Sequence, residues 1–239
     1  TVRPVYVDRL PPCNDACPSG ENIQGWLFHA ESGDYERAWR LLTEANPLPA
    51  CMGRVCYHPC ETACNRAQLD ECVGVNAIER FIGDEALKHG WKFRSATKST
   101  GMRVLVVGAG PSGLSAAYQL ARVGHTVTIR EAGPLAGGMM RFGIPKYRLP
   151  RAVLDAEIAR IAALGVSIVA GSSNQGESGV AARASKRCCQ KYQVESMSCA
   201  TSSPSLGVKV ASAICRYSAW YAIGAGWSAR STPSHASRI

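Results

Sequence analysis

Five cysteines in two short runs have the residue type and the spacing for thiolate chemistry. The first run contains Cys13 and Cys17, and a proline follows it; the second contains Cys56, Cys60 and Cys64. Tight loops that gather several cysteines form iron–sulfur sites, and proline often follows the last cysteine of such a run. Four thiolates also make a structural zinc site, but zinc modules favour gaps of two residues and every gap here is three. The spacing therefore favours an iron–sulfur cluster over zinc.

The remaining cysteines fit this pattern less well. Cys51 and Cys72 are spaced irregularly and are interpreted as ordinary thiols. His58 lies inside the second run, where packing beside the cluster is a better interpretation than ligation. Four further cysteines lie beyond residue 171 and receive no role.

A glycine-rich loop about fifty residues later has the context of a dinucleotide site. A buried strand is predicted at 103–107, a helix at 114–123 and a second strand at 126–130, which Glu131 closes. Glycines let the backbone approach a pyrophosphate, and the helix N-terminus offers it unpaired N–H groups. An acid at the end of the second strand binds ribose hydroxyls, which favours FAD or NAD over NADP. The predicted loop residues are Gly108, Gly110, Pro111, Ser112 and Gly113.

A second glycine pair and a basic residue extend this predicted cofactor site. Gly137 and Gly138 would let the chain pass close to the isoalloxazine or pyrophosphate, although a flexible turn is the alternative. Arg148 is placed in the site as a phosphate-facing group, with a solvated charge as the alternative. No side chain is predicted to act as a catalytic acid or base.

The elements that must position these residues form two units. Helical periodicity begins near Glu21 and predicts helices before and after 32–34 and another at 75–88, whereas the prolines of residues 1–20 predict an extended entry. A further helix at 151–165 and a strand at 166–170 follow the glycine loop. The predicted fold is an α-helical iron–sulfur domain, residues 1–92, a polar linker, 93–101, and an incomplete α/β Rossmann-like FAD-binding domain, 102–170.

Residues 171–239 differ in composition. Fifteen of these 69 residues are serine, and periodicity is nearly absent, which is typical of a low-complexity or disordered segment. This atypical tail, rich in Ser, Ala, Arg and Cys, is interpreted as disordered or as the product of a frame shift.

Charge and hydropathy exclude two classes of partner. Residues 171–239 contribute +6 of the net charge of +9, and no basic stripe alternates with aromatic residues, so nucleic-acid binding is not expected. No apolar stretch is long enough for a membrane span and no leader opens the chain, so a cytoplasmic protein without membrane contact is expected.

These motifs resemble the glutamate synthase small-subunit family. Residues 11–24, the run Gly53-Arg-Val-Cys56-x-x-Pro-Cys60-Glu-x-x-Cys64 and residues 78–81 are similar to its N-terminal iron–sulfur domain, which also resembles the N-terminal part of dihydropyrimidine dehydrogenase. Gly108–Gly113, Glu131, the 137–138 pair and residues 143–150 resemble the FAD site of the same family. The resemblance runs from about residue 3 to 170.

The resemblance implies an NAD(P)H-dependent oxidoreductase. In such flavoproteins hydride passes to FAD, and electrons leave singly through [4Fe-4S] clusters to a partner. The expected partner is therefore an electron-accepting protein subunit, or an electron-donating one where the flow is reversed. It assigns Cys13, Cys17, Cys56, Cys60 and Cys64 as cluster ligands, and Glu79 as a candidate non-cysteine ligand.

Two departures from the family limit these expectations. Members with two clusters carry a further cysteine pair upstream of Cys13, so one cluster is expected here. The second nucleotide-binding domain, which would hold NAD(P)H, is absent from these 239 residues, so the chain is interpreted as truncated. The alternatives to a flavoprotein enzyme are a non-catalytic relay module, an inactive fragment and a zinc-stabilised nucleotide-binding protein.

Overall fold

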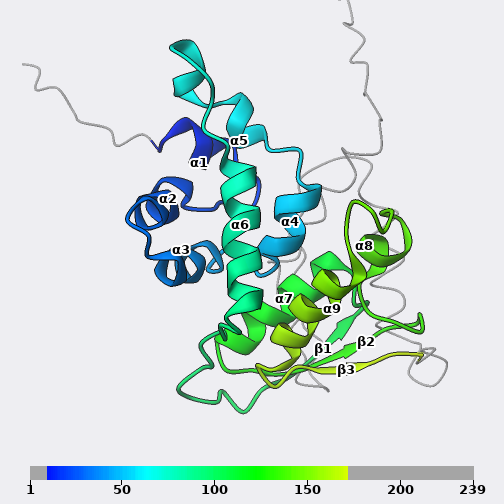
Figure 1. The fold of residues 1–239 in the computed structure, drawn as a ribbon. Helices are drawn as coiled ribbons and strands as arrows, with labels where there is room; N and C mark the ends of the chain where they lie inside the picture. The colour runs from blue at the N-terminus through cyan, green and yellow to red at the C-terminus, as the bar shows by residue number, and fades with distance from the viewer. Residues whose placement is uncertain (1–9, 172–239) are drawn as a thin grey trace, which may run out of the picture.

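The computed structural model describes residues 10–171, which form a helical unit and a three-stranded α/β unit in contact (Figure 1). The helical unit contains α1 (Pro12–Ala16), α2 (Ile23–Glu31), α3 (Tyr35–Leu42), α4 (Pro49–Val55), α5 (Pro59–Thr62), the 3-10 helix η1 (Asn65–Gln68) and α6 (Val75–Lys88). The α/β unit contains β1 (Arg103–Val107), α7 (Pro111–Arg122), β2 (Thr126–Arg130), α8 (Gly138–Phe142), α9 (Arg151–Ala162) and β3 (Ser167–Val169).

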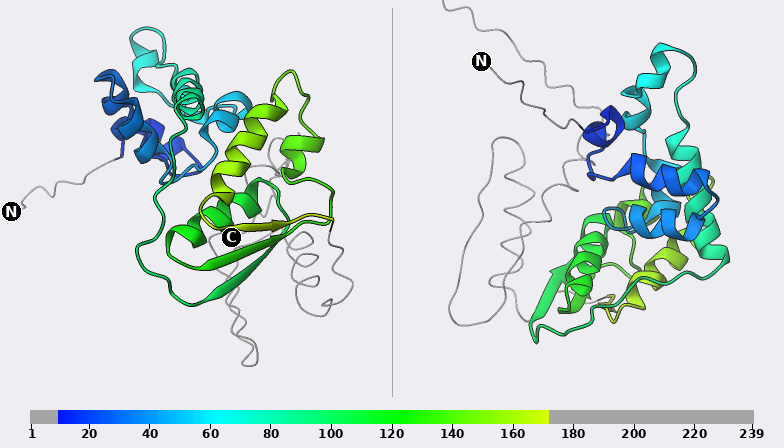
Figure 2. Two further views of the ribbon diagram at one scale, coloured as in Figure 1. Left: turned by 60° about the horizontal axis from the view of Figure 1, so that its bottom comes forward. Right: turned by 90° about the vertical axis from the view of Figure 1, so that its left-hand side faces the viewer.

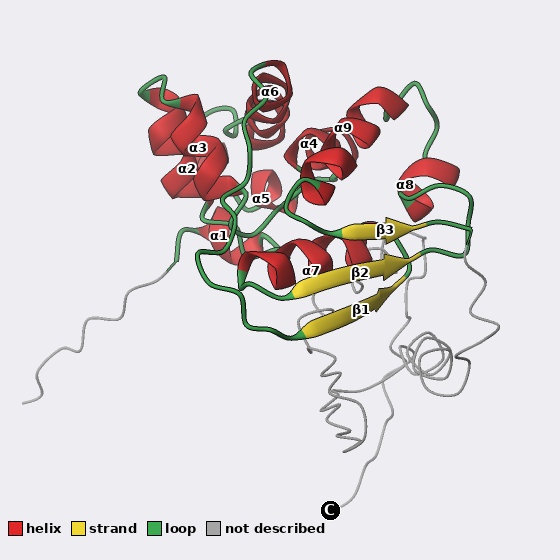
Figure 3. Ribbon diagram, turned by 90° about the horizontal axis from the view of Figure 1, so that it is seen from below, coloured by secondary structure: helices red, strands yellow, loops and turns green. Residues whose placement is uncertain are grey.

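The α/β unit is a parallel sheet in the order β1-β2-β3. Val104 lies opposite Val127, and Ile129 lies opposite Ile168. Parallel neighbours need crossover connections, and α7 and α9 supply them on the same side of the sheet (Figure 3). The carboxyl ends of the strands therefore lie at one edge, where the glycine loop and Glu131 follow them. The predicted fold class is confirmed.

The helical unit has its own core around two tryptophans. Trp26, Trp39 and Ile82 are at most 1 % exposed and pack with Leu42 and Ala86. Asn22 and Asp34 cap α2 and α3 by accepting hydrogen bonds from backbone N–H groups three residues ahead. Asn22 thus fixes the start of α2 and Asp34 the turn into α3, and each helix buries one tryptophan.

The helix α4 belongs to both units. Gly53 and Gly83 allow it to cross α6 at backbone contact: a Cβ at Gly83 would lie 2.4 Å from the Ala50 nitrogen. Its other side packs against α9, and Leu48, Cys51 and Met52 share a core with α7, α9 and the sheet. Figure 2 shows α4 lying between α6 and α9.

Several helices differ from the sequence expectation. The predicted extended entry contains α1, because Pro12 occupies the first helical position, where the missing N–H costs nothing. The predicted cysteine-rich loop contains α4 and α5, each again with a proline in its first turn. The glycine pair at 137–138 leads into α8.

The remaining expectations concern the ends of the chain and membranes. No helix or strand occurs between Lys88 and Arg103, where the linker is predicted. The predicted tail lies outside the described residues except for Gly171. Within residues 10–171, no helix is both long and apolar enough to cross a bilayer.

Candidate functional site

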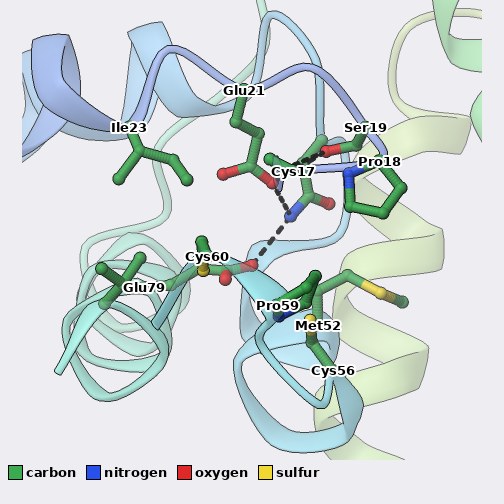
Figure 4. A pocket seen from close by; sticks show the side chains of 12 residues that line it. Cys17, Pro18, Ser19, Glu21, Ile23, Met52, Cys56, Pro59, Cys60 and Glu79 are labelled. Carbon is green, nitrogen blue, oxygen red and sulfur yellow. Dashed lines mark hydrogen bonds between the residues drawn. The ribbon is translucent and has the colours of Figure 1, made fainter. Parts of the chain in front are cut away.

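Three of the predicted cluster cysteines line one pocket of the helical unit. Cys17 follows α1, Cys56 follows α4 and Cys60 lies in α5, and all three side chains face the pocket with Glu79 of α6 (Figure 4). Ile23, Met52 and Val75 supply apolar walls. The three short helices thus position thiols that are up to 43 residues apart in sequence at one place.

A buried hydrogen-bond network joins polar side chains that line this pocket. The Asn46 amide donates to Oε1 of Glu21 over 3.0 Å and to Oε1 of Glu79 over 2.8 Å. Ser19 donates to Glu21 and lies 3.3 Å from the sulfur of Cys17. The side-chain oxygen of Asn46, Oδ1, accepts a hydrogen bond from the Leu48 backbone N–H, which connects the network to the start of α4.

The electrostatics of the pocket favour a cationic occupant. Burial raises the pKa of the Cys56 and Cys60 thiols to about 12 and also raises the pKa of Cys17. Burial raises the pKa of Glu79 and of Glu21 as well, with further repulsion between the two carboxyls at Glu79. None of the pocket-lining residues carries a positive charge. Iron would provide that charge and deprotonate the thiols that bind it.

The arrangement fits a cluster better than a single ion. Among residues 10–171, no three His, Cys, Asp or Glu side chains converge as one metal ion would require. A structural zinc ion needs four donors around one centre. An iron–sulfur cluster distributes its ligands over several irons and so accepts a wider separation. The thiol-rich, apolar pocket therefore fits the iron–sulfur expectation.

Cys13 and Cys64 lie outside this pocket. Cys13, in α1, is half-buried at the edge of the helical core, and its sulfur contacts Asn14. Cys64 follows α5, and a backbone hydrogen bond at Val73 lowers the pKa of its thiol. Their assignment as ligands stays a prediction from the sequence.

The strained residue of the cluster loop is His58. It has φ 48°, the left-handed region that non-glycine residues seldom adopt, and its backbone N–H donates to the sulfur of Cys56 over 3.2 Å. This conformation lets α5 begin at Pro59, directly after His58, and Cys60 in that helix faces the pocket.

The glycine loop has the tight geometry of a dinucleotide-binding turn. Gly108 has φ 93°, and a Cβ at Gly113 would lie 1.9 Å from the Gly108 carbonyl oxygen. The N-cap of α7, Gly110, offers no capping side chain, so the first turn, with Pro111 and Ser112, leaves its N–H groups to a ligand. The structure therefore places all five predicted loop residues in one turn.

The other predicted cofactor residues lie around this turn in different ways. Glu131 accepts from the Ala109 N–H over 2.6 Å and from the Gly133 N–H over 2.8 Å, so its carboxylate lies at the loop. Gly138 lies against Gly110, where a Cβ would be 2.8 Å from the Gly110 Cα. Arg148, between α8 and α9, is exposed.

Arg151, which the sequence analysis did not select, organises the segment after the glycine pair. Its guanidinium donates to the carbonyl oxygens of Met140 and Ile144, over 2.8 and 2.7 Å. The side chain therefore fixes α8 to the start of α9. A basic residue directly after the Leu149-Pro150 pair, at the first position of a helix, was the available sequence signal.

A buried carboxylate between the two units was also missed. Glu157 of α9 is fully buried and accepts from the backbone N–H groups of Ala50 and Cys51, over 3.2 and 3.1 Å. Burial raises the pKa of Glu157 to about 7, against the lowering effect of Arg160 and these hydrogen bonds. An acid within the apolar stripe of Leu154, Ile158 and Ile161 could have revealed it.

Two family models match the chain. Residues 8–91 match dihydropyrimidine dehydrogenase domain II, 4Fe-4S cluster, and residues 106–175 match the NAD(P)-binding Rossmann-like domain. The pocket lies in the first segment and the glycine loop in the second, so the chain combines an iron–sulfur domain with a Rossmann-like nucleotide-binding domain.

Three curated relatives are similar to this chain over about two thirds of its length. The chain is 39% identical to the NADP(+)-dependent formate dehydrogenase subunit beta of Moorella thermoacetica, over 66% of this chain and 25% of the relative. It is 38% identical to the glutamate synthase [NADPH] small chain of Mycobacterium tuberculosis, over 65% and 32%. It is 38% identical to the NAD-dependent dihydropyrimidine dehydrogenase subunit PreT of Escherichia coli K12, over 66% and 39%. The chain thus matches about a quarter to two fifths of each relative's length.

Proposed function

We propose that the chain, which matches dihydropyrimidine dehydrogenase domain II over residues 8–91 and is 38% identical to a glutamate synthase small chain, transfers electrons between a [4Fe-4S] cluster and FAD. The observation that carries this proposal is the pocket of Cys17, Cys56 and Cys60, which lacks a positive charge and lies in a unit packed directly on the glycine-loop unit. When bound, the cluster supplies one-electron transfer and FAD exchanges two electrons with a nicotinamide.

The residues of the pocket would hold the cluster through three thiolates and one carboxylate. Cys17, Cys56 and Cys60 provide the sulfurs, and Glu79 is the fourth ligand that we propose. Asn46 binds one oxygen of Glu79 and so orients the carboxyl group. Met52 and Ile23 exclude water from this side of the pocket.

The residues of the glycine loop would hold the pyrophosphate and ribose of FAD. The backbone N–H groups of Ser112 and Gly113, in the first turn of α7, would donate hydrogen bonds to phosphate oxygens. Glu131 would accept hydrogen bonds from ribose hydroxyls. The matching family model is described as NAD(P)-binding. FAD is proposed because a cluster takes electrons one at a time. A flavin accepts two electrons as hydride and can release them singly.

A partner and a compartment follow from the same reasoning. The formate dehydrogenase and dihydropyrimidine dehydrogenase relatives are named as subunits and the glutamate synthase relative as a small chain, so we propose an electron-accepting or -donating partner subunit. All seven cysteines in residues 10–171 are free thiols, which suits a reducing compartment such as the cytoplasm.

The test is an analysis of anaerobically purified protein for iron, sulfide, zinc and released flavin in one sample. About four iron and four sulfide per chain with FAD would support the proposal. Zinc without iron or flavin would contradict it. NAD(P)H-dependent dye reduction would assign enzyme activity to this chain, whereas bound cofactors without turnover would assign it a relay role.

Cysteine variants test the ligand set. Serine at Cys17, Cys56 or Cys60 should abolish the iron–sulfur absorption, because each removes a pocket thiolate. The variants Cys13→Ser and Cys64→Ser show whether these two thiols, outside the pocket, also bind iron. Equal iron retention in all five variants would contradict the proposed site.

A further inference from the structure

The contact between Glu157 and the start of α4 connects the two units. Glu157 lies in α9 of the glycine-loop unit, and its two oxygens accept from the Ala50 and Cys51 N–H groups of the helical unit. The carboxylate has no exposed surface, and Arg160 one turn later lies 3.8 Å from Oε1. Burying such a group is costly unless its oxygens are paired, so the contact fixes both partners.

The helix α4 has no capping group of its own. Its N-cap is Leu48, which has no polar side chain, and Pro49 at the first position has no N–H. Ala50 and Cys51 therefore carry the next unpaired N–H groups of the helix. Both are satisfied by a side chain more than a hundred residues later in the sequence.

The other end of α4 carries a proposed cluster ligand. The helix ends at Val55, and the Cys56 N–H still donates to the Met52 carbonyl oxygen over 2.9 Å. On the side of α6, the close approach at Gly53 and Gly83 leaves no space for α4 to move toward α6. The position of Cys56 therefore follows the position of the α4 N-terminus.

We propose that Glu157 is a positioning residue for electron transfer: it fixes α4, and through α4 the ligand Cys56, to the unit that carries the glycine loop. This inference rests on the proposed function, since it concerns the separation between cluster and flavin. Electron transfer depends on that separation and orientation, so a displaced cluster ligand should slow it. Arg160 supports the same contact by lying over the rings of Trp39 and Phe93.

The principal variant is Glu157→Gln in the full chain. Glutamine has the same length but turns one acceptor into a donor, so it opposes either the Ala50 or the Cys51 N–H. Glu157→Asp keeps the charge but is one methylene too short to serve both N–H groups, and it serves as the second variant if the first fails to fold. Glu36→Gln, an exposed change of the same type in α3, is the matched control.

A comparison variant separates positioning from stability. Tyr118→Phe removes the 2.6 Å hydrogen bond from the Tyr118 hydroxyl to the Thr43 carbonyl, at the same contact between units but away from α4. It should lower the free energy of unfolding without moving Cys56.

The readouts are the EPR signal of the reduced cluster, the rate of cluster reduction by photoreduced flavin, and amide hydrogen exchange at Ala50 and Cys51. For Glu157→Gln we expect iron and flavin content as in the wild type and an altered EPR signal. The rate of cluster reduction should be about tenfold lower, and amide exchange at Ala50 and Cys51 about tenfold faster. Tyr118→Phe and Glu36→Gln should leave the EPR signal, rate and exchange unchanged.

Two outcomes would overturn the inference. One is an unchanged rate and EPR signal in Glu157→Gln; the other is an equal slowing in Tyr118→Phe, which would mean a purely structural role. A wild-type protein without iron or flavin would instead overturn the proposed function. In that case exchange at Ala50 and Cys51 still decides whether Glu157 fixes α4, because unchanged protection in Glu157→Gln would refute the contact.

Discussion

Asn46 connects two buried carboxyl groups that would otherwise repel each other. Its amide donates to both Glu21 and Glu79, and its carbonyl accepts from Leu48. All three polar side chains are at most 7 % exposed. At the scale of single residues, this amide is therefore what makes an acidic, thiol-rich pocket compatible with a folded helical unit.

Removal of this amide should destabilise the protein strongly. In Asn46→Ala the two carboxyl groups lose their shared donor while buried, and we expect a loss of about 3 kcal/mol in the free energy of unfolding. Urea unfolding measured with and without bound iron checks this value. Asn14→Ala, which removes a half-buried asparagine of α1 that donates to Asn22, is the control, and an equal loss there would contradict the explanation.

The buried carboxyl of Glu157 should make stability depend on pH. Its pKa is raised from 4.5 to about 7 by burial, so the folded state holds a proton that the unfolded state releases in this interval. Its contribution is therefore present at low pH and is lost as pH rises through 7, by about 3 kcal/mol between about pH 4 and pH 8. The difference in unfolding free energy between wild type and Glu157→Gln should fall by that amount as pH rises. Parallel pH profiles would refute this prediction.

At the scale of helices and strands, the sequence predicted the regular elements well. The bounds of α6, β1 and β2 agree with the structure, because periodicity is strong there. The helices α4 and α5 were missed because their cysteines, prolines and glycine have weak helix propensity, and tertiary contacts supply the stability instead. Phe81, an apolar residue of α6, is 45 % exposed and packs on Tyr35.

The candidate site was likewise predicted in part and missed in part. Cysteine spacing predicted one thiolate site for Cys13, Cys17, Cys56, Cys60 and Cys64, and the pocket contains the second, third and fourth of these. The separation of Cys13 and Cys64 from this pocket depends on where α1 and α5 end, which spacing does not show. The role of Asn46 was not predicted, because a hydrogen bond over 33 residues leaves no local pattern.

The crossing of α4 and α6 should not tolerate a methyl group. In Gly83→Ala the new Cβ would lie 2.4 Å from the Ala50 nitrogen, and the backbone of α4 would have to move. We expect a net loss of about 2 kcal/mol, although alanine gains about 1 kcal/mol in helix propensity. Thermal unfolding of this variant is compared with Gly74→Ala, where the Cβ would meet only Ala77 at 3.9 Å. Equal effects would argue against a backbone clash.

At the scale of the whole molecule, the two units share their packing. Leu48, Cys51 and Met52 lie in the same hydrophobic cluster as the sheet and α7. Gln119 and Arg122 of α7 donate to the Glu44 carbonyl oxygen, each over 2.9 Å. Phe93 of the connecting segment stacks on Trp39 and contacts Tyr118, so aromatic packing continues across the boundary.

Residues 10–171 should therefore unfold in one cooperative transition. We expect the calorimetric and van't Hoff enthalpies to agree, because neither unit keeps its core when the other opens. Cleavage of the exposed segment 94–101 by a protease should leave the two pieces associated on size-exclusion chromatography. Two separate transitions, or immediate separation of the pieces, would contradict this prediction.

The shared helix α4 has a consequence for recombination of such domains. A gene fusion made at the linker would move α4 with the helical unit and leave behind the surface of α7 and α9 that it covers. The α/β unit left behind would have an exposed apolar face and, at Glu157, a carboxylate that has lost both of its N–H partners. Exchange of the helical unit between homologues should therefore succeed only when α9 is transferred with it, so that the heritable module is larger than the linker suggests.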